Sequence, residues 1–130
     1  MLNVMAVDDI TYWNIVFDYV LSSSTTIRSL AEDYGIGAAT VRRYLHKTAE
    51  IDPSIHRMVC IKATLNQKFE TQGTYVASNA VIKHLRAVQK KLNARKTTPP
   101  NMSDYLWKGY KGSLFDVLEG LFKGKRKKSI

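Results

Sequence analysis

Two short amphipathic segments joined by a glycine-containing turn constrain the fold of this chain more than any other feature. Residues 26–34 place apolar side chains at positions i, i+3, i+4 and i+7, the spacing of one face of an α-helix. Residues 38–48 form a second short helical segment, with Val41, Tyr44 and Leu45 expected on its inward side. Between them stands Gly35-Ile36-Gly37, where a glycine can adopt a backbone conformation that a Cβ atom penalises. The pattern predicts a helix, a tight turn and a second helix.

The residue types around this turn are typical of a helix-turn-helix. Ala31 lies four residues before Gly35 and is small enough to let the second helix approach closely. Ile36 and Val41 are placed to close the apolar corner between the two helices. We therefore expect residues 38–48 to be a recognition helix that enters the major groove of DNA. A glycine-linked helix pair within an ordinary helical bundle would give the same pattern.

The outward side of the 38–48 helix carries residues that can meet DNA. Small residues at its start allow close approach to base edges, and alanine methyls can contact thymine methyls. Arg42 and Arg43 can make bidentate contacts to guanine or can bind phosphate. Tyr44 can also reach a phosphate in this interpretation. The predicted DNA-binding residues of this segment are Gly37, Ala38, Ala39, Thr40, Arg42, Arg43, His46 and Lys47.

Positive charge is concentrated in the second half of the sequence. The chain has 130 residues and a net charge of +9, but residues 1–60 sum to −2 and residues 61–130 sum to +11. Phosphate backbones attract such clusters through counterion release. The expected phosphate contacts are Lys83, Arg86, Lys90, Lys91, Arg95 and Lys96. The terminal cluster 123–130 adds a second basic segment, for which a solvated solubility tail is an equally good interpretation.

The remaining segments indicate an all-α fold with additional C-terminal helices. Residues 10–21 are apolar nearly all round, which favours a buried helix capped by Asp8 or Asp9, although a strand is possible there. Pro53 after Asp52 favours a helix start, and a longer helix is expected over 54–71. Another is expected over 75–95, with Val81, Leu85, Val88 and Leu92 at heptad-like spacing. A last helical piece begins near Ser103. We divide the chain into four parts. They are a helix-turn-helix core at 1–60, a basic helical extension at 61–98, a C-terminal helical segment at 99–122 and a basic tail at 123–130.

Several functional classes are disfavoured by the sequence. It contains no apolar run of about 18 residues and no secretory signal, so we expect a cytoplasmic protein without a membrane span. The lone Cys60 is expected to pack as a small hydrophobic residue. The three histidines lack metal-ligand spacing, and no catalytic constellation is visible. We therefore expect no enzyme activity, no metal and no cofactor.

The apolar residues near the C-terminus allow three interpretations. They can belong to the core by packing on helix 10–21, form a homodimer interface, or stack on single-stranded nucleic acid. The residues concerned are Trp107, Tyr110, Phe115, Leu118, Leu121 and Phe122.

The stretch from Thr26 to about Pro53 resembles the sporulation stage III protein D family of bacterial transcription regulators. The similarity is carried by Thr26-Ile27-Arg28, Ala31, Tyr34-Gly35-Ile36, Thr40-Val41, Leu45 and Glu50-Ile51-Asp52-Pro53. The resemblance implies a small protein whose recognition helix enters the major groove and whose basic C-terminal segment adds DNA contacts. The recognition helix here carries its own residues, so the resemblance implies no particular target sequence. A regulator from a phage or another mobile element fits as well.

The sequence thus predicts a double-stranded DNA-binding transcriptional regulator associated with the nucleoid. The alternative is a phage or mobile-element interaction module, in which a helix-turn-helix scaffold inhibits a host nucleic-acid-binding protein. An RNA-binding role is less favoured, because aromatic-rich strands that would stack bases are lacking in the sequence.

Overall fold

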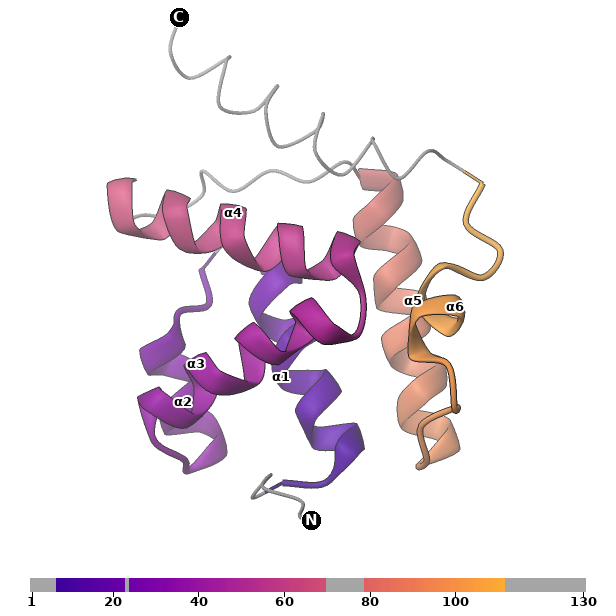
Figure 1. Ribbon diagram of the computed structural model, residues 1–130, viewed down its shortest axis with the longest axis horizontal. Coiled ribbons are helices and arrows are strands. Elements are labelled where there is room, and N and C mark those ends of the chain that lie inside the picture. The colour runs from indigo at the N-terminus through magenta and orange to yellow at the C-terminus, as the bar shows by residue number, and fades with distance from the viewer. Residues whose placement is uncertain (1–6, 23, 70–78, 112–130) are drawn as a thin grey trace, which may run out of the picture.

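The chain folds into helices throughout the part that the structure describes. A computed structural model describes residues 7–22, 24–69 and 79–111 (Figure 1). The helices are α1 (Asp9–Leu21), α2 (Ile27–Tyr34), α3 (Ala38–Lys47), the 3₁₀ turn η1 (Thr48–Glu50), α4 (Pro53–Phe69), α5 (Asn79–Arg95) and α6 (Met102–Trp107). The expected all-α fold is confirmed. Within these ranges, no helix is long and apolar enough to cross a lipid bilayer.

Helix α1 lies at the centre of the molecule. Asp8 caps it, since its Oδ1 accepts the backbone N–H of Thr11 at 2.8 Å. Eight of its thirteen side chains are buried, which is why its sequence is apolar on nearly every side. Burial of each large apolar side chain contributes roughly 1.5–3 kcal/mol. The predicted helix over residues 10–21 is confirmed, and the strand alternative is wrong.

Helix α5 packs lengthwise against α1. Its inward positions follow the spacing expected from the sequence, and the side chains of Val81, Leu85, Val88 and Leu92 are all buried. A row of polar side chains joins the two helices beside this apolar contact. The Gln89 amide donates to Asn14 at 2.9 Å, and the Asn14 amide donates to Asn93 at 2.7 Å. These bonds fix the register of α5 along α1.

The short helix α6 packs on α5 and on the start of α4. The Trp107 ring stacks on His84 of α5, with ring planes 8° apart and centroids separated by 5.9 Å. Leu106 is fully buried in the core, to which α6 therefore contributes. The sequence suggested helix 10–21 as the partner of this segment, whereas the observed partner is mainly α5. The other apolar residues of the predicted C-terminal segment, Phe115, Leu118, Leu121 and Phe122, lie outside the described residues.

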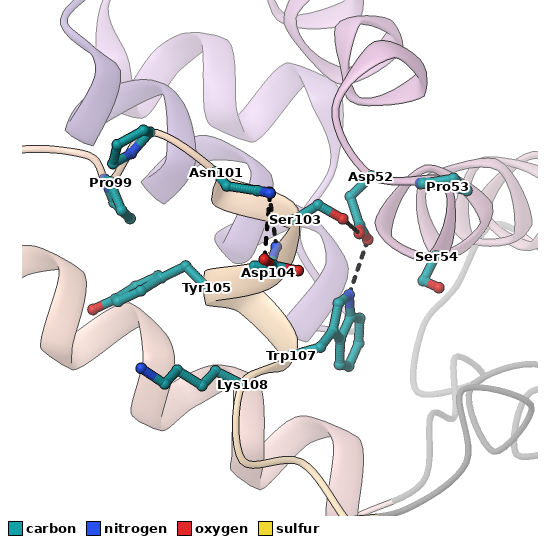
Figure 2. A pocket seen from close by; sticks show the side chains of 11 residues that line it. Asp52, Pro53, Ser54, Pro99, Asn101, Ser103, Asp104, Tyr105, Trp107 and Lys108 are labelled. Atoms are coloured by element: carbon teal, nitrogen blue, oxygen red, sulfur yellow. Dashed lines mark hydrogen bonds between the residues drawn. The ribbon is translucent and has the colours of Figure 1, made fainter.

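A buried carboxylate connects α6 to α4. Asp52 caps α4 by accepting the Ile55 N–H at 2.9 Å. Its two oxygens also accept the Ser103 hydroxyl at 2.6 Å and the Trp107 indole N–H at 3.0 Å (Figure 2). The side chain is only 3% exposed, so these three donors replace its water shell. The sequence indicated Pro53 as a helix start but gave no sign of the two distant donors.

Replacing Asp52 should therefore destabilise the fold strongly. Asp52→Ala removes a helix cap and leaves the Trp107 and Ser103 donors without their acceptor, which should cost about 2–4 kcal/mol. Ser103→Ala removes one of the three bonds and should cost about 1 kcal/mol. Urea denaturation followed by tryptophan fluorescence measures both values. Equal costs for the two variants would show that the carboxylate does not join α4 to α6.

A buried lysine closes the C-terminal end of α1. The Lys62 side chain is fully buried, and its ammonium donates to the backbone carbonyls of Tyr19 and Ser22. The same ammonium lies 4.4 Å from the centroid of the Tyr19 ring. These carbonyls belong to the last turn of α1 and the residue after it, where a positive charge is favourable. Burial nevertheless lowers the pKa of Lys62 from 10.5 to about 7.

The lowered pKa makes stability depend on pH in a defined direction. Between the folded pKa of about 7 and the ordinary value of 10.5, the unfolded chain binds a proton that the folded chain lacks. The free energy of unfolding should therefore rise with pH, by at most about 1.4 kcal/mol per pH unit. Lys62→Met removes this titration. Urea denaturation between about pH 7.5 and about pH 9 should show stability rising for the wild type relative to the variant. If the free energy of unfolding changed with pH equally in the wild type and in Lys62→Met, the lowered pKa of Lys62 would be contradicted.

Candidate nucleic-acid interface

Helix α2 is fixed at its start by a reciprocal pair of hydrogen bonds. The Thr26 hydroxyl accepts the Ser29 N–H at 3.0 Å, and the Ser29 hydroxyl accepts the Thr26 N–H at 3.0 Å. This capping box satisfies donors that a helix end otherwise leaves without partners. Leu30 is buried, while Ile27 and Tyr34 pack at the edge of the core. The predicted helix over 26–34 is confirmed, with Thr26 as the cap.

The turn after α2 depends on Gly35. This residue has φ +66° and ψ 35°, in the left-handed region. Its N–H donates to the Ala31 carbonyl, and the Ile36 N–H donates to the same carbonyl at 3.0 Å. These bonds end α2 and turn the chain sharply toward α3. Gly37 has an ordinary φ of −75° and stands at the N-cap of α3.

Helix α3 is held against α1 by its inward face. Val41, Tyr44 and Leu45 are buried there. The Tyr12 hydroxyl of α1 donates to the Tyr44 carbonyl at 2.9 Å, and the two rings meet edge to face with centroids 5.7 Å apart. Burial raises the pKa of Tyr12, to which the charge of Glu50 adds. The hydroxyl therefore stays protonated and keeps donating.

The opposite face of α3 is open to solvent. Ala39, Arg42, Arg43 and His46 are exposed and stand at positions i, i+3, i+4 and i+7. We call these four residues the α3 stripe. Since 3.6 residues make one helical turn, they share one side of the helix, away from its buried face. Gly37 at the helix start is exposed as well, while Ala38, Thr40 and Lys47 are half-buried at its margins.

One predicted phosphate contact on α3 is wrong. Tyr44 is only 3% exposed, and its ring packs against Tyr12. Tyr44 lies on the same buried face of α3 as Val41 and Leu45, so its side chain cannot reach DNA in this fold. The sequence already placed Tyr44 on the inward side, and burial is the role that the structure confirms.

The predicted basic residues of α5 are exposed but lie apart from the α3 stripe. All five of these residues, and the predicted Lys96 directly after the helix, are on the surface. Helices α3 and α5 pack on different sides of α1 (Figure 1). Arg86 donates to the Leu21 carbonyl at 3.1 Å, and Arg95 donates to the Thr97 carbonyl at 3.2 Å. The structure therefore brings the α3 residues together but does not join the α5 residues to them.

Two further side chains bear on the surface chemistry. Arg28 is exposed in the first turn of α2 and was not among the predicted contacts, although its position beside the Thr26 cap marks it as outward.

Cys60 is exposed, with its sulfur 3.4 Å from the Nε2 atom of His56. The expectation that Cys60 packs as a small hydrophobic residue is therefore wrong. Its place on α4 is one turn beyond His56, on the outward side of the helix.

An open groove lies beside the buried Asp52. It has a volume of about 1000 Å³ and runs between the start of α4 and residues 99–108 (Figure 2). Both oxygens of Asp52 already accept hydrogen bonds from neighbouring groups. Among the described residues, no group of three His, Cys, Asp or Glu side chains could hold a metal ion. The groove thus carries interactions that stabilise the fold.

Comparison with known proteins finds no match to this chain among family models, curated proteins or solved structures. The resemblance to the sporulation stage III protein D family therefore stays a prediction.

The turn geometry makes opposite predictions for its two glycines. Gly35→Ala puts a Cβ on a residue with φ +66°. This substitution should cost about 1 kcal/mol of stability. Gly37→Ala is the matched control, because its φ is ordinary and the nearest atom to an added Cβ is the Thr40 hydroxyl at 3.9 Å. This variant should be nearly neutral in urea denaturation. A larger loss for Gly37→Ala would contradict the described turn.

Proposed function

We propose that this protein binds double-stranded DNA with sequence specificity and regulates transcription. The single observation that carries the proposal is the α3 stripe. It presents two neighbouring guanidinium groups on an exposed helix that follows a tight turn. A helix presented in this way fits the major groove of B-DNA, which is wide enough to admit one. A location at the nucleoid follows from this function.

Each part of α3 has a distinct role in this proposal. Arg42 and Arg43 donate bidentately to the O6 and N7 atoms of guanine, the commonest specific contact of this kind. The Ala39 methyl contacts a thymine methyl, and His46 lies one turn further along the same side. The lack of side-chain bulk at Gly37 lets the N-terminal end of the helix come close to the base edges.

Contacts to the DNA backbone position the recognition helix. Thr40 and Lys47 lie at the margins of the stripe, and Arg28 lies in the first turn of α2. In a helix-turn-helix the first helix of the pair crosses the DNA backbone, so Arg28 is suited to a phosphate contact. Such contacts fix the register of the protein but carry no sequence information themselves.

In vitro selection of bound duplexes, followed by binding titrations, tests the proposal. Arg42→Ala and Arg43→Ala should each weaken binding to the selected duplex by about 1–3 kcal/mol. Binding to a random duplex of equal length should weaken much less, because the lost contacts are to bases. The symmetry of the recovered site also reports whether a homodimer binds.

Arg57→Ala is the matched control for these variants. Arg57 is an exposed arginine on α4 and is not part of the α3 stripe, so its loss removes the same charge from another surface. Its affinity for the selected duplex should stay close to that of the wild type. Equal losses on selected and random DNA for the α3 variants would show backbone contacts only. No duplex shift at low salt would contradict DNA binding and favour the protein-interaction alternative.

A further inference from the structure

The outer side of α5 is a positively charged surface without an assigned role in reading bases. Between residues 79 and 96 the sequence has six Lys and Arg residues and no Asp or Glu. Lys83, Ala87, Lys90 and Ala94 are exposed and share the side of the helix opposite its buried face. We call these four residues the α5 stripe. The small alanine side chains do not project beside the two lysines, so a flat or convex partner can approach the helix closely.

The two lysines are exposed charges on the side of α5 that faces away from the core. Arg86 is bonded to the Leu21 carbonyl and lines a cavity of about 120 Å³ with Asp18 and Asp33, which offset its charge. Arg95 is bonded to the Thr97 carbonyl and lies 5.6 Å from the Tyr105 ring centroid. Lys83 and Lys90 stand two helical turns apart, about 10 Å along the axis. They form the centre of the surface that faces solvent.

The α5 stripe and the α3 stripe face in different directions. On α1, Tyr12 bonds to α3 and Asn14 bonds to α5. Two residues along an α-helix correspond to a rotation of about 200°, so these two bonds leave α1 from nearly opposite sides. In Figure 1, α3 crosses in front of α1, whereas α5 stands beside α1 on the right. Each stripe lies on the side of its own helix that faces away from the core.

A straight duplex seated on α3 therefore cannot also lie on α5. Duplex DNA has a persistence length of about 150 base pairs, and bending 20–30 base pairs by 40–90° costs roughly 1–6 kcal/mol. We propose that the α5 stripe binds a second duplex segment through its phosphates, so that one protein molecule bridges two segments. Only the α3 half of this bridge rests on the function proposed above.

The chemistry of the stripe favours a duplex backbone over other partners. Lysine ammonium groups are compact point charges that bind phosphates and lack the planar fork of arginine. The four residues include no aromatic side chain on which an unpaired base could stack, which argues against single-stranded nucleic acid. The stripe also lacks the large apolar side chains with which a protein helix would pack.

A two-duplex capture assay tests this inference with the full chain. The selected duplex is immobilised, protein is added, and capture of a soluble, labelled random duplex is measured. The wild type should capture the second duplex with one protein chain per two duplexes. Lys83→Gln/Lys90→Gln should retain binding to the immobilised duplex but reduce capture about tenfold at low salt. The salt slope of capture should fall by about two, one for each lost phosphate contact.

Arg57→Gln/Lys108→Gln is the matched control, because it removes two exposed charges from α4 and from the end of α6. It should capture the second duplex nearly as well as the wild type. Urea denaturation checks that both double variants fold equally well. Undiminished capture by Lys83→Gln/Lys90→Gln would overturn the inference and indicate bridging by a dimer. The inference would also be overturned if the wild type captured no second duplex and Lys83→Gln/Lys90→Gln bound one long duplex more weakly than the wild type. That result would favour a single bent duplex that contacts both stripes.

Failure of this inference is separable from failure of the proposed function. If α3 does not read DNA, Arg42→Ala/Arg43→Ala will leave sequence preference unchanged. Binding of a random duplex will then still depend on Lys83 and Lys90 if the α5 stripe binds phosphates. If only the α5 inference fails, sequence preference will depend on the arginines and the lysine variant will capture like the wild type.

Discussion

The burial of α1 on nearly all sides is the constraint on which the rest of the structure depends. A helix that is apolar all round must be enclosed, and one neighbouring helix can cover only part of its circumference. Helices α3, α4 and α5 therefore pack around it, with α2 beside α3. Helices α3 and α5 each pack on α1 and make little contact with each other. The separation of the two charged surfaces is a consequence of core packing.

Directional polar bonds determine how the helices are rotated around this core. Apolar burial is roughly proportional to area and does not specify orientation by itself. The Tyr12 hydroxyl bonds to the Tyr44 carbonyl, and Gln89 bonds to both Asn14 and Asp18. The first bond turns the buried face of α3 inward, so that its arginines are exposed. The side-chain bonds hold α5 so that its lysines face solvent.

The sequence predicts those features that depend on neighbours a few residues apart. The capped helix starts, the turn at Gly35 and the inward spacing of α5 follow local rules, and the structure confirms them. It does not predict contacts between distant segments. The acceptor role of Asp52 toward Trp107, the burial of Lys62 beneath α1 and the exposure of Cys60 each depend on how helices pack. A lysine in an amphipathic sequence ordinarily indicates a solvated position, so tertiary packing overrode the local pattern at Lys62.

The charge distribution shows why a linear count of basic residues gives an incomplete account of such a protein. The sequence suggests that α5 reinforces the DNA contacts of α3, but in the fold the two helices pack on different sides of α1. Because charges beyond about 8–10 Å are largely screened at physiological ionic strength, lysines across the molecule add little to a contact at α3. The residue types differ accordingly. The α3 stripe carries arginines, whose forked guanidinium groups can distinguish base edges, and the α5 stripe carries lysines, which bind phosphates as point charges. This division of side-chain chemistry supports two distinct surfaces, one suited to reading sequence and one suited to holding a backbone.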